Sequence, residues 1–129
     1  MHALPSEVLA LVDGGNVAHV ATLMADGAPH SVPMWIASEG DRVAFLSSPS
    51  SVKARNIRRD PRVSISVTES DRPNSMAQVR GHVAEIVDGD RGWAIIDRIA
   101  QRYIGAPYPL RSDRVAFLVD VERAWAQSF

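Results

Sequence analysis

The chain has 129 residues, 46% hydrophobic and 22% charged, and its formal net charge is −1 with neutral histidines. This balance is typical of one globular domain and argues against a protein that binds nucleic acid or anionic membranes through a general cationic surface. The absence of cysteine excludes disulfides, zinc–thiolate sites, iron–sulfur clusters and thiol catalysis. We expect one domain over residues 1–129, located in the cytoplasm, because the first residues lack the basic and apolar regions of a secretory leader.

The first half of the chain is predicted to form a short helix followed by antiparallel strands. Gly14 and Gly15 end the amphipathic helix, and Asp26-Gly27 is a hairpin signal between two strands. Pro33 lies inside the second strand, where its missing N–H indicates a sheet edge or a bulge. The expected elements are a helix over 6–12 and strands over 16–24, 30–37 and 42–47.

The second half is predicted to hold two more helices and the remaining strands. Val63, Ile65 and Val67 alternate with small polar residues, which is the pattern of a half-buried strand. Gly81 indicates a bulge or a close backbone approach in the next strand. Apolar residues at three- and four-residue spacing predict a long helix before a final apolar strand. The expected elements are helices over about 51–59 and 88–103, strands over 62–68, 77–86 and 114–121, a loop over 69–75 and a short last strand over 124–126.

Antiparallel hairpins dominate this order of elements, and helices do not alternate regularly with strands. A doubly wound parallel sheet is therefore not expected. The pattern favours a mainly β fold, a small antiparallel barrel of six or seven strands with peripheral helices packed outside it. Apolar residues on both faces of the first strand also indicate that its outer surface is covered, as it would be by a second subunit.

The basic residues have an unusual distribution, because thirteen of the fourteen are arginine and the one lysine, Lys53, follows a hydroxyl-rich turn. Ser50 or Ser51 is a natural N-cap, which places Lys53 in the first turn of the next helix. A cation there opposes the positive end of the helix dipole unless an anion occupies the same end. Two interpretations remain open from these residues alone: a phosphate-binding site, or an exposed lysine without a function.

Other recognisable chemistries are missing from the sequence. No two of the four histidines have the spacing of metal ligands, no serine lies in a nucleophile-elbow pattern, and glycine-rich phosphate loops are absent. Trp35 and Trp125 are candidates either for the wall of a site that binds a flat phosphorylated ligand or for ordinary core and interface packing. The residues themselves identify no metal site and no general acid.

Eight short segments of the chain resemble a known family in their order and spacing. They are Val20–Leu23, Asp26–Pro29, Val32–Trp35, Phe45–Ser47, Lys53–Ser64, Val79–Gly81, Ile95–Tyr103 and Val121–Trp125. Together they resemble the pyridoxamine phosphate oxidase-like superfamily of flavin-binding split barrels. More narrowly, the chain is similar to the short members that depend on the deazaflavin coenzyme F-420. The resemblance implies a split β-barrel that forms a homodimer, with coenzyme F-420 or FMN bound at the dimer interface.

The resemblance also implies which residues lie beside the cofactor ring. The strand backbone at Val32, Pro33, Met34 and Trp35 would run along the ring, with Met34 and Trp35 forming its wall. Gln78 matches a family glutamine that reaches the ring from the partner subunit. These assignments come from the family pattern and not from the spacing of the residues alone.

A second set of residues would hold the cofactor phosphate, as implied by the same resemblance. This set comprises Ser47, Ser51 and Lys53, with Arg55 and Asn56 nearby. The family has an arginine immediately before the lysine, and this chain has Val52 at that position. The departure removes one phosphate ligand and favours the deazaflavin over FMN.

The activity implied is that of an oxidoreductase transferring hydride to or from a small organic substrate. An alternative is a non-catalytic binder or carrier of a flavin, haem or similar flat cofactor, which the absence of an evident acid–base pair supports. A barrel that binds single-stranded nucleic acid by stacking is a third class, which the net charge disfavours. Pyridoxamine phosphate oxidation is not expected, because the C-terminal segment that grips this substrate has no counterpart before the chain stops at Phe129.

Overall fold

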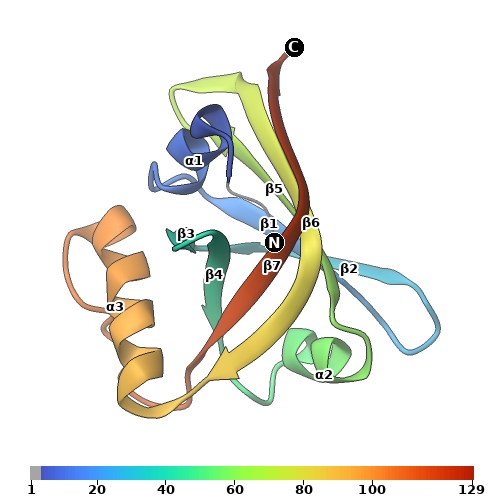
Figure 1. The fold of residues 1–129 in the computed structure, drawn as a ribbon. Helices are drawn as coiled ribbons and strands as arrows, with labels where there is room; N and C mark the ends of the chain where they lie inside the picture. Colours follow the sequence, from blue (N-terminus) through green and yellow to red (C-terminus); the bar gives the residue numbers. More distant parts are fainter. Residues whose placement is uncertain (1–3) are drawn as a thin grey trace.

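The computed structural model describes residues 4–129. The expected absence of a secretory leader depends partly on residues 1–3, which lie outside the described residues. Seven strands form one antiparallel sheet that curls into a barrel, and three helices pack around it (Figure 1). The helices are α1 (Ser6–Val12), α2 (Val52–Arg59) and α3 (Gly89–Ile104). The strands are β1 (Ala18–Leu23), β2 (Pro29–Met34), β3 (Ile36–Glu39), β4 (Arg42–Ser47), β5 (Arg62–Glu69), β6 (Arg72–Val87) and β7 (Val115–Ser128). The predicted mainly β split barrel with peripheral helices is confirmed.

The sheet is split between two strands that follow each other in the chain. Its order is β2-β1-β5-β6-β7-β4-β3, so β2 and β3 lie at opposite ends of the ladder although one residue separates them. β2 pairs with β1, and β3 pairs with β4. The chain therefore crosses from one edge of the sheet to the other at Trp35. β3, after the crossing, pairs with β4, whereas β2, before it, does not.

The sequence pattern wrongly predicted one strand over 30–37, and a contact from α3 explains the break. The hydroxyl of Tyr103 accepts a hydrogen bond from the backbone N–H of Ile36 at 2.9 Å and donates one to the carbonyl of Asn16 at 2.7 Å. These bonds take the place of ladder partners next to Trp35, so the backbone polar groups are satisfied without a continuous strand. Pro33 does lie on an edge strand, as expected.

The last two strands are longer than predicted, because they support each other. Within the segment 69–75, predicted as a loop, only Ser70 and Asp71 form a turn, because β5 ends at Glu69 and β6 already begins at Arg72. The predicted strands over 114–121 and 124–126 are one strand, β7, whose register with β6 runs from Ser75↔Ser128 to Val87↔Ala116. Gly81 lies at a shift in this register, where an added Cβ would come 2.0 Å from the carbonyl oxygen of Asp120.

Two apolar clusters hold the helices and the barrel together. Inside the barrel, the rings of Phe45 and Phe117 stack at 4.9 Å between centroids. Outside it, Leu46 and Leu118 of the sheet pack against the apolar face of α3, which includes Ile96. β4 is therefore buried on both faces. No helix within residues 4–129 has the length and apolar character needed to span a membrane.

Candidate functional site

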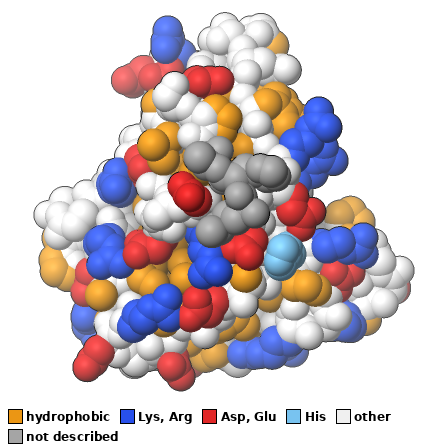
Figure 2. Space-filling model, in the orientation of Figure 1, with side chains coloured by type: hydrophobic (Ala, Val, Ile, Leu, Met, Phe, Trp, Pro, Cys, Tyr) orange, Lys and Arg blue, Asp and Glu red, His pale blue; other side chains and the backbone are white. Residues whose placement is uncertain are grey.

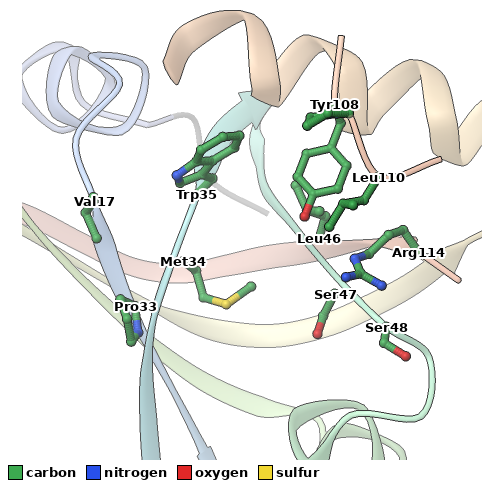
Figure 3. Close-up of a pocket in the computed structure, with 11 residues that line it drawn as sticks. Val17, Pro33, Met34, Trp35, Leu46, Ser47, Ser48, Tyr108, Leu110 and Arg114 are labelled. Carbon is green, nitrogen blue, oxygen red and sulfur yellow. The ribbon is translucent and has the colours of Figure 1, made fainter. Parts of the chain in front are cut away.

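A pocket of about 630 Å³ occupies the split of the barrel, between the β2–β3 segment and β4 (Figure 3). It forms there because β2 pairs with β1 and leaves the last residues of β4 without a partner on that side. The loop that follows α3 covers the top of the pocket, as Figure 3 shows. The lining residues are Val17, Pro33, Met34, Trp35, Leu46, Ser47, Ser48, Tyr108, Pro109, Leu110 and Arg114.

Trp35 is a fixed wall of this pocket. Its ring stacks on the ring of Tyr103 with centroids 4.8 Å apart and planes within 4°, and the ring of Tyr108 meets it edge-on at 5.9 Å. Burial raises the pKa of Tyr103, so its hydroxyl stays protonated at neutral pH and keeps donating to the backbone. The stacked contact with Tyr103 and the edge-on contact with Tyr108 hold the Trp35 ring in one orientation.

The serine turn, residues Ser47–Ser51, forms the floor between the pocket and α2. The hydroxyl of Ser47 donates to that of Ser51 at 3.1 Å, and the hydroxyl of Ser48 donates to the carboxylate of Asp113 at 2.9 Å. Two arginines of α2 reach back and donate to carbonyl oxygens of the turn, Arg55 to Ser50 and Arg58 to Pro49. These bonds fix the turn and surround it with positive charge.

Lys53 lies at the start of α2, next to this turn. Ser51 caps the helix, since its hydroxyl accepts from the backbone N–H of Ala54 at 3.1 Å, as predicted. The amides of Val52 and Lys53 have no acceptor among the described residues, as expected for a first helical turn. The Lys53 amine likewise makes no hydrogen bond or ion pair within residues 4–129, and partial burial lowers its pKa. Free amides and an unpaired ammonium at one helix end suit an anion.

The other predicted phosphate residues have different environments. Ser47 lines the pocket, whereas Arg55 is exposed and bound to the serine turn. Asn56 is buried, donates to the hydroxyl of Thr22 at 3.0 Å and accepts from Arg59 at 2.8 Å, so its side chain ties α2 to β1. The structure thus brings Ser47, Ser51 and Lys53 together around one turn and commits Asn56 to packing.

The predicted ring residues separate into two groups. Pro33, Met34 and Trp35 line the pocket, but Val32 pairs with Val20 and does not. Gln78 lies on β6, where its amide donates to the hydroxyl of Ser64 at 2.8 Å, outside the pocket of this chain.

No individual role was predicted from the sequence for the residues that form the roof of the pocket, which are Tyr108, Leu110 and Arg114. The carboxylate of Asp97 on α3 accepts from the backbone N–H of Tyr108 at 3.0 Å and from the guanidinium of Arg111 at 2.6 Å. Both bonds lower the pKa of Asp97, with the Arg111 bond contributing most, so it stays ionised at neutral pH. Arg111 and Asp97 therefore fasten the roof to the helix. The sequence signals for the roof were weak: Tyr108 and Arg114 enclose a short loop that contains Pro109.

Known proteins share this architecture over nearly the whole chain. The family profile described as pyridoxamine 5′-phosphate oxidase matches residues 4–128. A solved structure described as an F420 reductase is 30% identical, with a TM-score of 0.80 over 95% of this chain and 98% of that chain. A conserved hypothetical protein from Mycobacterium tuberculosis is 25% identical, with a TM-score of 0.80 over 99% of this chain and 86% of that one.

More distant structures share the fold alone. HupZ of group A Streptococcus is 22% identical, with a TM-score of 0.69 over 97% of this chain and 94% of that chain. No curated protein matches the chain in sequence. The split barrel, the pocket in its split and the profile match over residues 4–128 lead to one conclusion: the chain belongs to the pyridoxamine 5′-phosphate oxidase family.

Proposed function

We propose that the protein is an oxidoreductase that binds a flat, phosphate-bearing cofactor, a deazaflavin or a flavin, in the split of its barrel. The observation that carries the proposal is the unpaired, partly buried amine of Lys53 at the capped start of α2, beside a pocket walled by Trp35. A partly buried charge without a partner is unfavourable. We therefore infer that the partner of Lys53 is an anion supplied by a bound ligand. The pocket volume of about 630 Å³ suits a multi-ring ligand.

The residues present fit such a cofactor at both of its ends. Lys53, the free amides of α2 and the hydroxyls of Ser47 and Ser51 would hold the phosphate. Met34 and Trp35 would pack on the ring, whose edge would run along β2. When bound, a deazaflavin or flavin supplies the hydride chemistry, and the protein supplies binding, orientation and exclusion of water.

We assign the deazaflavin coenzyme F-420 as the first choice and FMN as the second. Val52 replaces the arginine that would give a further phosphate ligand, and a similar solved structure is described as an F420 reductase. Purified protein should be titrated with each cofactor while tryptophan fluorescence is recorded. Tighter binding of coenzyme F-420 is expected; a protein that purifies yellow with FMN and does not bind coenzyme F-420 would reverse the choice.

We further propose that the functional unit is a homodimer that forms through the outer face of the sheet. The registers place Pro33, His19, Ser66, Gln78 and Trp125 in one row across five neighbouring strands. Because Pro33 also lines the pocket, this row continues directly from the pocket lip. A second copy docked on this face would bring its own polar side chains, Gln78 included, towards the pocket.

The dimer is tested by measuring the mass in solution. Sedimentation should give twice the chain mass of 14.1 kDa. Trp125→Glu should shift the protein towards the monomer, because it replaces a large aromatic side chain of the row by a charge. Ile104→Glu is the matched control, since Ile104 is 47% exposed at the end of α3, on a different element. A wild-type monomer at micromolar concentration would contradict the proposal.

A non-catalytic carrier of a flat cofactor is the second candidate, and one observation favours it. Among the described residues that line the pocket there is no carboxylate and no histidine; the titratable groups are Tyr108 and Arg114. The chain thus offers little acid–base chemistry of its own. Stopped-flow oxidation of reduced coenzyme F-420 or FMN, with a panel of nitroaromatic and enone acceptors, separates the two functions. Turnover with any acceptor supports the enzyme, and binding without turnover supports the carrier.

Binding of single-stranded nucleic acid is disfavoured by the charge distribution. Acidic and basic side chains are interspersed on the face shown in Figure 2, and most arginines of residues 4–129 pair with carboxylates or lie on aromatic rings. A continuous cationic groove is not present on that face, although such proteins need one to follow the nucleic-acid backbone.

A further inference from the structure

Arg114 stands at the end of the roof, one residue before β7, and its side chain lines the pocket. Figure 3 shows its guanidinium extending into the pocket between Leu110 and Ser47. The side chain is partly buried and donates one hydrogen bond, from Nη1 to the carbonyl oxygen of Asp113 at 2.7 Å. No carboxylate within residues 4–129 forms an ion pair with it.

The nearest acidic residue in the sequence is turned to another partner. Asp113 has a left-handed backbone with φ of 57°, and its carboxylate accepts from the hydroxyl of Ser48 at 2.9 Å. This conformation is accessible to aspartate at a small cost. The consequence is that Asp113 fastens the roof to the serine turn, while most of the donors of Arg114 remain available inside the pocket. A guanidinium has five N–H donors, and the carbonyl oxygen of Asp113 is the one acceptor that Arg114 has within residues 4–129, so most of these donors have no protein partner.

Arg114 and Lys53 occupy different parts of the site. Lys53 is on α2 and does not line the pocket, whereas Arg114 belongs to the roof together with Tyr108 and Leu110. A phosphate held by Lys53 and the free amides of α2 would not need the donors of Arg114, which come from another element. Tyr108 meets Trp35 edge-on at 5.9 Å, so the surroundings of this second position are aromatic and apolar.

The roof is held in place before any ligand binds. Asp97 fastens Tyr108 and Arg111, and the guanidinium of Arg111 lies 4.3 Å from the centroid of the Trp93 ring. At the other end, the Asp113–Ser48 bond anchors the residue next to Arg114. A preorganised arginine beside a flat apolar surface recognises a planar carboxylate best, because the guanidinium fork matches both carboxylate oxygens.

We propose that Arg114, Tyr108 and Leu110 form a subsite for a planar aromatic or conjugated carboxylate. Arg114 binds the carboxylate, and the aromatic and apolar side chains of the roof pack on the ring. Calling this ligand the substrate rests on the proposed function, but the binding site itself does not. The subsite narrows the small organic substrate of the proposed reaction to an anionic, conjugated molecule.

The test compares two probes of similar shape and different charge, 2-naphthoate and 2-naphthol, titrated calorimetrically into the cofactor-free full chain. Wild type should bind 2-naphthoate more tightly than 2-naphthol. Arg114→Gln should weaken 2-naphthoate binding roughly tenfold or more and leave 2-naphthol unchanged. Arg114→Lys should recover part of the loss. Arg98→Gln, which removes a charge from an exposed pair on α3, is the matched control and should change neither probe.

Two results would overturn the subsite. One is equal 2-naphthoate affinity in wild type and Arg114→Gln, which includes the case of no measurable binding to either. The other is a loss of coenzyme F-420 or FMN affinity in Arg114→Gln as large as in Lys53→Met, which would assign Arg114 to the cofactor phosphate. A failure of the proposed function would give a different result. Wild type would then bind neither cofactor, but it would still bind 2-naphthoate more tightly than 2-naphthol.

Discussion

Replacing Lys53 by methionine should have opposite effects on ligand-free stability and on cofactor affinity. The substitution keeps most of the aliphatic stem and removes the charge. In the free protein the Lys53 amine has no partner within residues 4–129, and burial lowers its pKa, so its charge is unfavourable there. Lys53→Met should therefore raise the melting temperature of the ligand-free protein. The lost charge-assisted contact should cost about 1.5–3 kcal/mol of binding, which raises the Kd roughly 10- to 150-fold.

The pH dependence gives an independent check with a definite sign. Anion binding requires the protonated amine, and the pKa of Lys53 in the free protein is below that of an ordinary lysine. Wild-type affinity should thus fall as the pH rises through this lowered pKa. By the same linkage, the charge of Lys53 penalises folding in full below that pKa, and the penalty disappears as the pH rises from the lowered pKa to that of an ordinary lysine. Lys53→Met should show neither dependence.

Fluorescence titration with coenzyme F-420 and FMN between neutral and alkaline pH, together with thermal unfolding, measures these effects. Arg98→Met is the matched control, because it removes one positive charge from an ion pair between α3 and Glu39 of β3, which is not among the pocket residues. It should leave the affinity unchanged. Equal affinities of wild type and Lys53→Met at neutral pH would refute the assignment of Lys53 to the phosphate and return it to a lysine without a function.

Three further substitutions test how the site is built. Ser51→Ala removes the cap of α2 and should lower the free energy of unfolding in urea by about 1 kcal/mol; an unchanged midpoint would mean that the hydroxyl does not cap. Gly81→Ala should destabilise by about 1–3 kcal/mol, since the new Cβ would clash with the Asp120 carbonyl, and unaltered thermal unfolding would contradict the close approach. Asp97→Ala should release the roof at Tyr108, seen as faster hydrogen exchange over 105–112, whereas equal exchange would show that the roof is held elsewhere.

Elements with purely local signals were predictable from the sequence. The helix over 6–12 and the strand over 42–47 were predicted with the observed bounds, because apolar spacing and flanking turns specify them. The break at Trp35 was not predictable, because it depends on the hydroxyl of Tyr103, which comes from a helix far along the chain. The early start of β6 has the same kind of cause: the backbone N–H of Phe129 donates to the carbonyl of Asn74, so the C-terminus extends the hairpin.

The candidate site also has one part with a local sequence signal and one part that depends on contacts between distant residues. The residues proposed to hold the anion could be grouped from the sequence, because a cap, a hydroxyl-rich turn and one lysine lie within a few residues of each other. The roof could not be predicted, because Tyr108 and Arg114 lie in an aperiodic loop that acquires its position from Asp97 and Asp113. A loop of this kind has no pattern in the sequence that indicates which way its side chains face.

The edge of β2 that faces the split is suited to a ligand and unsuited to another strand. Pro29 and Pro33 are four residues apart, so their nitrogens lie on the same side of β2, and they pair in register with Leu23 and His19 of β1. A proline nitrogen cannot donate a hydrogen bond, so the β1–β2 ladder is complete only if both proline nitrogens face away from β1. The open edge then presents carbonyl oxygens with Ser31 as the one N–H donor between the prolines. An incoming strand would lack its donors there, which protects the edge against strand addition. An N–H group of a flat heterocycle can donate to these carbonyl oxygens, so the prolines of β2 leave an acceptor-rich edge next to Trp35.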